Sequence, residues 1–347
     1  MKAVVVESNK NFVIKEVATP KVEHEHDVLV KVLYSGVCGS DIPRMFHHGA
    51  HNYPIILGHE FSGLVVDVGS AVTNLKKDDL VVCAPLLPCF NCPECARGFY
   101  SLCKNYDFVG SRRPGANAEY ICVHEKNIVK IDRNSDPLFS SFIEPITVGL
   151  HAINLAHGCE NKNVIIVGAG TIGLLAMQSA KGLGAKTVSV IDINEEKLTL
   201  AKTLGADFAF NSANLSAKEI HASLDAHRFD QLVLETAGTP QTVSLSIEIA
   251  GPRAQVGLVG TLHKDLTLEQ TVFGLILRKE LTILGSWMNY SKPWPGSEWT
   301  TAMNLINAGK INIQPLIACV KPAEGYVDEL VKLDGKPMNG KIVLDMH

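Results

Sequence analysis

The sequence has no excess of basic residues, few aromatic side chains and no long apolar run. Its 32 lysines and arginines are outnumbered by 36 aspartates and glutamates, which gives a formal net charge of −4. A nucleic-acid-binding face needs a basic excess, and base stacking needs aromatic side chains, which are only 6% of this chain. A chain with 46% hydrophobic and 20% charged residues is also neither disordered, collagen-like nor a coiled coil. The 347 residues predict a globular protein of about two domains.

No segment has the pattern of a targeting signal or a membrane span. Glu7 interrupts the apolar run at the N-terminus, well short of a signal peptide. The longest uncharged run, residues 163–180, includes three glycines and several polar residues, which do not suit a lipid-facing helix. We therefore expect a cytoplasmic protein with neither a membrane nor a nucleic acid as partner.

The pattern of the chain changes near position 150. Before it, alternating apolar runs such as Val28–Val32 predict half-buried strands. After position 160, apolar runs alternate with helical periods, as at Leu198, Ala201 and Leu204, and Gly205 is a typical helix stop. Strands that alternate with helices form parallel sheets, and six strands suffice for a doubly wound Rossmann domain. We expect strands at 163–167, 186–191, 207–210, 231–234, 254–259 and 281–284, and helices at 195–204 and 241–250.

These patterns predict an α/β protein with two domains. A β-rich domain is expected over residues 1–150, and a nucleotide-binding domain with a parallel sheet over 151–289. The last segment, 290–347, returns to a mixed pattern, so we expect it to rejoin the first domain.

A glycine-rich loop follows the first expected strand of the second domain. Gly168, Gly170 and Gly173 fit the pattern G-x-G-x-x-G, with Thr171 and Ile172 between the last two. In this setting the first glycine allows a tight turn, the second lets a pyrophosphate approach the backbone, and the third lets helix pack on strand. The phosphates would bind at the helix N-terminus.

Asp192 lies 19 positions after Gly173, at the end of the next expected strand. A carboxylate there accepts hydrogen bonds from a ribose 2′-hydroxyl and repels a 2′-phosphate, so NAD is favoured over NADP. Lys197 would close over the same ribose. The alternative is that Asp192 only ends a strand and that Lys197 is a solvated surface lysine.

Four of the nine cysteines lie within fifteen positions, at Cys89, Cys92, Cys95 and Cys103. Four thiolates on one loop give a tetrahedral, structural zinc site with no position left for substrate. The alternatives are an iron–sulfur cluster, two disulfides or free thiols. Prolines and a glycine in the loop argue against a helix or strand through it, so the metal would supply the order.

Several motifs together resemble the zinc-dependent medium-chain alcohol and polyol dehydrogenases. They are Cys38-Gly39-Ser40-Asp41, Gly58-His59-Glu60, the four-cysteine loop, Glu144-Pro145 and the glycine loop, in that order along the chain. The resemblance covers essentially the whole length. It implies a GroES-like catalytic domain with one catalytic and one structural zinc, a Rossmann domain that binds NAD, and a homodimer or homotetramer formed through the edge of the Rossmann sheet.

The resemblance also implies roles for individual residues. Cys38, His59 and Glu144 would hold the catalytic ion, with a fourth position left to water or substrate, although the pattern does not exclude manganese or cobalt. Glu60 would lie in the surroundings of the ion or bind it transiently. Ser40 would take the proton from the substrate hydroxyl, but Pro43 replaces a histidine that many relatives use to pass that proton on. Pro145 would place Glu144 at a helix N-cap, and a simple cap is the alternative for Glu144.

Longer stretches, among them 106–113, 142–151 and 285–290, are similar to the polyol-phosphate branch of the family. That similarity implies hydride transfer from a secondary hydroxyl of galactitol 1-phosphate to NAD, which gives tagatose 6-phosphate. A dehydrogenase of an unphosphorylated polyol or diol is the alternative, and a non-catalytic, zinc-free protein is a second one. A phosphate needs cationic donors, and the candidates are Arg44, Arg112, Arg113 and Lys292, each of which could instead be a solvated surface charge.

Overall fold

The computed structural model describes residues 1–336 and 338–347, which form two compact units. The first unit comprises Met1–Glu144, Ser291–Trp299 and Ile313–His347, and the second comprises Pro145–Tyr290 and Thr300–Asn312. The observed division and the boundary expected at position 150 both lie in helix α4 (Ile143–Leu155).

Mostly antiparallel sheets build the first unit. In the larger sheet, the buried Val28, Val30 and Val32 share one face of β3, as the alternation predicted. The seven-stranded sheet has the order β10 (Ile128–Lys130), β6 (Leu80–Cys83), β5 (Glu60–Val68), β3 (Asp27–Gly36), β18 (Lys341–Asp345) and β17 (Ile317–Lys321), with β9 (Tyr120–His124) also paired to β3. A three-stranded sheet has the order β2 (Asn11–Glu16), β1 (Lys2–Ser8) and β4 (Ile55–Ile56), and β7 (Leu86–Leu87) pairs with β8 (Asp107–Phe108).

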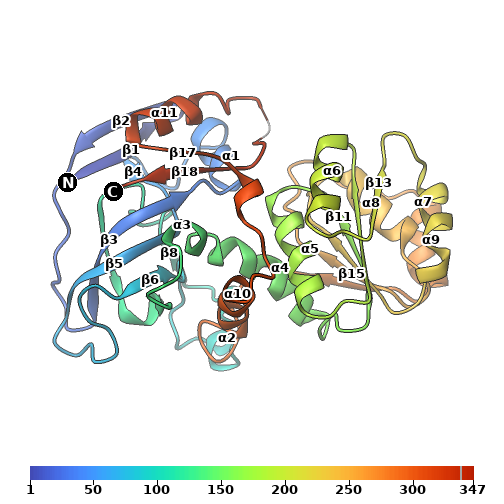
Figure 1. The fold of residues 1–347 in the computed structure, drawn as a ribbon, viewed down its shortest axis with the longest axis horizontal. Coiled ribbons are helices and arrows are strands. Elements are labelled where there is room, and N and C mark those ends of the chain that lie inside the picture. The colour runs from blue at the N-terminus through green and yellow to red at the C-terminus, as the bar shows by residue number, and fades with distance from the viewer. Residues whose placement is uncertain (337) are drawn as a thin grey trace. The chain divides into compact units, whose positions relative to one another are not determined.

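The register of three strands brings distant parts of the sequence together in this sheet. Gly36, at the end of β3, is the partner of Glu60 at the start of β5. Gly36 is also the partner of Val343 in β18, so the C-terminal strand lies beside β3 (Figure 1). The segment that follows Gly36 therefore lies close to both Glu60 and the start of β18.

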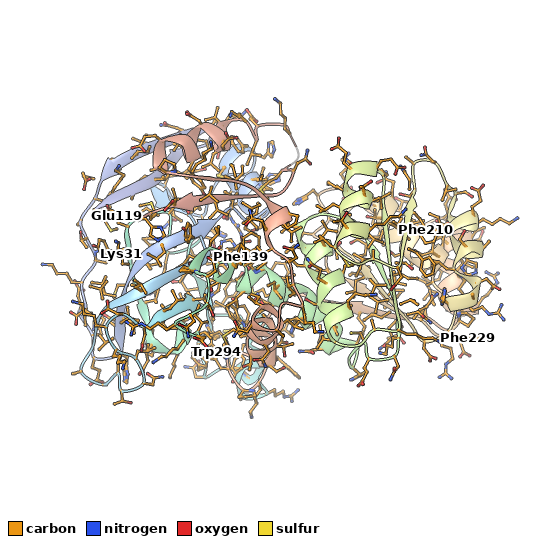
Figure 2. All side chains as sticks on the ribbon, viewed as in Figure 1. Lys31, Glu119, Phe139, Phe210, Phe229 and Trp294 are labelled. Carbon is orange, nitrogen blue, oxygen red and sulfur yellow. The ribbon has the colours of Figure 1, made fainter. Side chains whose placement is uncertain are left out.

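A parallel sheet forms the centre of the second unit and confirms the predicted Rossmann fold. Its six strands have the order β13 (Phe208–Asn211), β12 (Thr187–Asp192), β11 (Asn163–Val167), β14 (Gln231–Glu235), β15 (Gln255–Leu258) and β16 (Thr282–Gly285). Every residue of β11 and β14 is buried, as expected where helices cover both faces of a sheet. Phe210 on β13 packs against the core of this unit (Figure 2).

Helices connect the strands of both units, and one helix of the first unit contradicts the sequence analysis. The four-cysteine loop does contain a helix, α2 (Pro93–Ala96), because proline is well tolerated at the first helical position. The remaining α-helices are α1 (Asp41–Phe46), α3 (Pro137–Ser140), α5 (Thr171–Gly182), α6 (Glu195–Thr203), α7 (Ala217–Ser223), α8 (Pro240–Ile249), α9 (Gln270–Arg278), α10 (Ser297–Asn307) and α11 (Ala323–Val331). Short 3-10 turns lie at Tyr100–Leu102, Glu125–Asn127, Asp225–His227 and Gln314–Leu316.

Within the two described ranges, no helix combines the length and apolar character that crossing a membrane would require.

We expect Gly173→Ala to destabilise the second unit by about 1–3 kcal/mol, because overpacking forces the backbone to shift. A Cβ at Gly173 would lie 1.9 Å from the carbonyl oxygen of Gly168. Gly170→Ala is the matched control, since a Cβ there meets nothing within 4 Å. Thermal unfolding of both variants checks this, and equal melting temperatures for the two would contradict the packing role of Gly173.

Candidate metal centre and nucleotide loop

Three potential metal ligands converge beside the paired ends of β3 and β5. Cys38 follows the end of β3, and His59 and Glu60 stand at the beginning of β5. One ligand atom from each of these three residues lies within 4.8 Å of the other two. His59 and Glu60 are almost fully buried, at 4% and 1% exposed, while Cys38 is half-buried. The structure therefore brings together two of the predicted metal ligands, Cys38 and His59, with Glu60, which was expected in the surroundings of the ion or as a transient ligand.

The chemistry of this cluster fits a divalent cation. Among the described residues, none forms a hydrogen bond with the buried Oε1 of Glu60, and the buried Nδ1 of His59 has an ion-pair contact with Asp41 in place of a hydrogen bond. A buried polar atom without a partner is unfavourable by about 1–3 kcal/mol, and a bound cation would remove that penalty for the carboxylate oxygen. A thiolate, an imidazole and a carboxylate are the ligands of open zinc sites, in which one further position stays available.

Asp41 orients the imidazole of His59. Its Oδ2 lies 3.5 Å from Nδ1, which leaves Nε2 as the ring nitrogen available to a metal. Burial alone lowers the pKa of His59, but the charges of Asp41, Cys38 and Glu144 outweigh it and raise the pKa to about 10. An anionic environment that favours a proton on this ring also favours a divalent cation in the proton's place.

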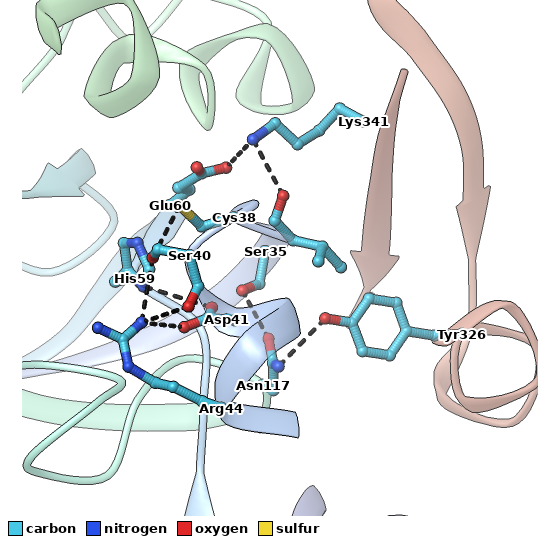
Figure 3. Close-up of polar contacts among 11 residues, drawn as sticks. Ser35, Cys38, Ser40, Asp41, Arg44, His59, Glu60, Asn117, Tyr326 and Lys341 are labelled. Atoms are coloured by element: carbon cyan, nitrogen blue, oxygen red, sulfur yellow. Dashed lines mark hydrogen bonds and ion pairs between the residues drawn. The ribbon is translucent and has the colours of Figure 1, made fainter. Parts of the chain in front are cut away.

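Lys341 holds the other oxygen of Glu60. Its Nζ donates to Oε2 at 2.5 Å and to the carbonyl oxygen of Val37 at 3.0 Å (Figure 3). Burial lowers the pKa of this lysine, but the charges of Glu60, Cys38 and Glu144 raise it overall, so the side chain stays charged. The ion pair fixes the carboxylate while leaving Oε1 free to face the cluster. Sequence reasoning missed Lys341, because nothing local to it signals a partner 281 positions away.

Glu144 lies near the cluster, in the first turn of α4. The prediction that it is an N-cap is wrong, since the helix begins one residue earlier, at Ile143. Proline is tolerated throughout a first turn, where its missing N–H is not needed, so Pro145 did not mark the first helical residue. Glu144 is 9% exposed, and its charge raises the pKa of His59 and of Lys341. The three-residue group found in the described part of the first unit does not include it.

Ser40 and Arg44 extend the site along α1. The hydroxyl of Ser40 donates to Sγ of Cys38 at 3.2 Å. Nη1 of Arg44 donates to Oγ of Ser40 at 3.0 Å and to Oδ1 of Asp41 at 2.9 Å (Figure 3). The Ser40–Arg44 spacing of four residues, typical of neighbours on a helix, is the signal that could have predicted this contact. Pro43 stands in the same helix and offers no group that can carry a proton.

The four predicted cysteines form a second cluster. Their sulfur atoms lie within 4.8 Å of one another, and none of the four is in a disulfide. A tetrahedral ion with metal–sulfur bonds of about 2.3 Å separates its sulfurs by about 3.8 Å. The distance from Cys103 Sγ to Cys89 Sγ is 3.6 Å, and that to Cys92 Sγ is 3.9 Å, so the cavity matches a single ion. The backbone N–H of Asn91 and other donors lower the pKa of Cys89 to about 7, which favours a thiolate.

The glycine loop has the geometry that its sequence predicts. Gly168 follows β11 with φ of +104°, in the left-handed region that favours glycine. Gly170 is the N-cap of α5, and Thr171 and Ile172 form the first positions of that helix. Space is open around a Cβ at Gly170, whereas Gly173 packs directly on Gly168. A 12-residue helix thus presents its N-terminal N–H groups behind an uncrowded backbone.

Asp192 ends β12 beside this loop. Its Oδ2 accepts a hydrogen bond from the N–H of Ala169 at 2.7 Å, and its Oδ1 accepts one from Asn194 at 2.9 Å. The carboxylate is thus held against the glycine loop. Lys197 lies in the first turn of α6, and its backbone N–H is bound by the N-cap side chain of Asn194.

Comparisons with known proteins agree with this architecture. Residues 24–133 match the alcohol dehydrogenase GroES-like domain, and residues 171–308 match the zinc-binding dehydrogenase domain. The chain is 55% identical to galactitol 1-phosphate 5-dehydrogenase of Escherichia coli K12 over 99% of both chains. The crystal structure of galactitol-1-phosphate dehydrogenase from Escherichia coli superposes with a TM-score of 0.98, at 55% identity, over 99% of this chain and 100% of that one.

A relative with lower sequence identity also matches over nearly the whole chain. L-threonine 3-dehydrogenase of Symbiobacterium thermophilum is 32% identical over 98% of this chain and 95% of its own length. The matched domains, the full-length relatives and the two clusters of metal-binding side chains lead to one conclusion. The chain belongs to the zinc-binding, medium-chain alcohol dehydrogenase family.

Proposed function

We propose that this chain is a zinc- and NAD-dependent dehydrogenase that oxidises a secondary hydroxyl of galactitol 1-phosphate to give tagatose 6-phosphate. The observation that carries the proposal is the 55% identity, over 99% of both chains, to an enzyme named for that substrate. The cluster of Cys38, His59 and Glu60 supports it, because a chain kept only for binding would have no need of an open metal site.

The residues around the cluster have separable tasks. A zinc ion bound there would act as a Lewis acid that lowers the pKa of the substrate hydroxyl. Ser40, whose Oγ contacts Cys38 Sγ, would accept the proton of a hydroxyl at the open position while its own hydroxyl proton passes to solvent. Arg44, which donates to the same Oγ, would hold the Ser40 hydroxyl in place during this exchange. NAD would accept the hydride.

If the function is correct, the catalytic efficiency with NAD is higher for galactitol 1-phosphate than for galactitol by about tenfold or more, since charge-assisted hydrogen bonds to a phosphate are strong. Initial rates with each polyol at several concentrations give the two values of kcat/KM. A higher value for galactitol would instead support the alternative, a dehydrogenase of unphosphorylated polyols or diols.

Two carboxylates compete for the role of third metal ligand. The family resemblance predicts Glu144. We propose Glu60 for the resting enzyme, because its orphaned Oε1 belongs to the same three-residue cluster as Cys38 and His59. Glu144 would then act on the group at the open position, close enough for its charge to reach His59.

Glu60→Gln and Glu144→Gln separate these assignments. We expect E60Q to bind the catalytic zinc about 10- to 100-fold more weakly or to lose it, because an amide oxygen is a poorer ligand than a carboxylate. E144Q should keep two zinc ions per chain and lose turnover. Elemental analysis after dialysis, together with rates, makes the distinction. Loss of one zinc from E144Q and retention of both by E60Q would identify Glu144 as the ligand.

We propose NAD rather than NADP as the cofactor. Asp192 supports this, because a carboxylate at the end of β12 repels a 2′-phosphate. Lys197, in the next helix, would contact the same ribose.

Asp192→Ala should lower kcat/KM for NAD and narrow the ratio of NAD to NADP efficiency by about tenfold or more, since one repelled phosphate corresponds to at least about 1.4 kcal/mol. The ratio is the decisive readout. Any loosening of the glycine loop through the lost bond to Ala169 affects both cofactors alike. An unchanged ratio in D192A would remove Asp192 from the selectivity site.

We propose that the protein forms a homo-oligomer through the β16 edge of the Rossmann sheet. Within residues 1–336 and 338–347, β16 pairs with β15 alone, so its other side presents unpaired backbone groups. Ile283 on this strand is 39% exposed, and on α9 of the same unit Phe273 and Leu277 are 54% and 67% exposed. An exposed strand edge close to apolar side chains is typical of a subunit interface.

We also propose a reducing, cytoplasmic setting. All nine cysteines are free, including the four of the second cluster, whose sulfur atoms lie within 4.8 Å of one another. Such thiols persist as metal ligands only where they are kept reduced.

A further inference from the structure

We propose that Arg44 and Arg112 bind the phosphate group of the substrate beside the metal cluster. The inference rests on the proposed function, since it assigns the site for the phosphate of a polyol phosphate. The sequence offers four cations without ranking them, and the structure distinguishes two of them by their positions and partners. In the substrate, several bonds of the carbon chain separate the phosphate from the reacting hydroxyl. The cations that bind the phosphate must therefore lie near the metal cluster but outside it.

Arg44 meets that requirement through two residues of the site. Its Nη1 contacts both Ser40, which is bonded to Cys38, and Asp41, which orients His59. All hydrogen bonds from Arg44 to described residues use Nη1, so Nη2 and Nε are left to donate to a ligand. The side chain is 28% exposed, which keeps it ordered and still accessible. A guanidinium with one edge anchored and the other open suits a phosphate, which accepts two parallel hydrogen bonds.

Arg112 approaches from the turn after β8. Its backbone N–H donates to the carbonyl oxygen of Phe108 at 3.0 Å, and the ring of Phe108 packs edge-on against His59 with centroids 5.4 Å apart. Tyr106 holds the guanidinium, with Cζ 4.3 Å from the ring centroid and Nη2 donating to the hydroxyl at 3.2 Å. Across residues 1–336 and 338–347, no carboxylate forms an ion pair with Arg112. It is thus an oriented, exposed cation without an ion-pair partner in the described part of the chain, and its backbone is bonded to the residue whose ring contacts His59.

The charges of both guanidinium groups influence the same side chain, that of His51. His51, in the loop after α1, has its pKa lowered by burial and then by the charges of Arg112 and Arg44. The fields of both arginines therefore overlap at His51. A phosphate bound there would interact favourably with both charges.

The other two candidates are excluded by their surroundings. Arg113 uses its Nε for the ion pair with Asp107, so the edge of the guanidinium that Arg44 keeps open is already occupied in Arg113. The side chain of Lys292 packs against Gly98, in the loop of the four-cysteine cluster, because a Cβ at Gly98 would lie 2.5 Å from the Cβ of Lys292. That lysine belongs to the surroundings of the structural site rather than the catalytic one.

Arg112→Gln tests the proposal, with the neighbouring Arg113→Gln as the matched control. We expect R112Q to lower kcat/KM for galactitol 1-phosphate by about 10- to 100-fold, mainly through KM, because a charge-assisted hydrogen bond is lost. The rate on galactitol should not change in R112Q, and R113Q should leave both substrates within about threefold. An equal loss on both substrates, or an equal effect of R112Q and R113Q, would overturn the assignment.

Binding of inorganic phosphate to the zinc-loaded enzyme, measured by calorimetry, supplies a readout apart from turnover. We expect about tenfold weaker binding in both R44Q and R112Q and unchanged binding in R113Q, with melting temperatures to confirm folding. If the wild-type enzyme prefers galactitol, the proposed function fails and this site fails with it. If the wild type prefers the phosphorylated substrate and R112Q keeps both that preference and phosphate affinity, only the site is wrong.

Discussion

The ion pair between Glu60 and Lys341 is almost completely buried, with side chains 1% and 4% exposed. Breaking a buried pair by removing one partner is unfavourable by about 3–5 kcal/mol, because the remaining charge stays buried. This pair therefore needs β5 and β18 to stay in register with β3, where Gly36 is the common partner of both strands. The same register sets Cys38 beside His59. The position of the metal ligands thus depends on a contact that includes the end of the chain.

The two cysteine-containing clusters differ in their donor atoms, and this difference distinguishes a structural metal site from a catalytic one. The four-thiolate cluster offers a complete tetrahedral shell and belongs to a loop with little regular structure, so an ion there contributes folding energy. The other cluster offers one sulfur, one nitrogen and one carboxylate oxygen. Part of its hydrogen bonding is already satisfied, since Glu60 accepts from Lys341 through Oε2 and has no hydrogen bond within the described residues at Oε1. An ion in this second setting keeps a position for another ligand, which is what a reaction at a hydroxyl group requires.

Features that depend on neighbours in sequence could be predicted, and those that depend on register could not. The six parallel strands and the glycine loop follow from apolar runs and from the spacing of Gly168 and Gly173, and the four-thiol cluster follows from the spacing of its cysteines. The roles of Lys341 and Asp41 arise only when distant strands pair, so no local pattern announces them. The start of α4 was misplaced because a proline fits any position of a first turn.

Helix α1 has only six residues, but it positions several side chains of the proposed site. Asp41 stands at its first position and orients a metal ligand, while Ser40 just before it contacts Cys38. Arg44, one turn later, bonds to both of these residues and keeps its remaining donors open. Pro43, in the same helix, has no group that can carry a proton, so the proton that Ser40 is proposed to take would need a route that does not use this position. In the proposed enzyme, a displacement of α1 would therefore alter proton transfer and phosphate binding together, because the same short helix positions both Ser40 and Arg44.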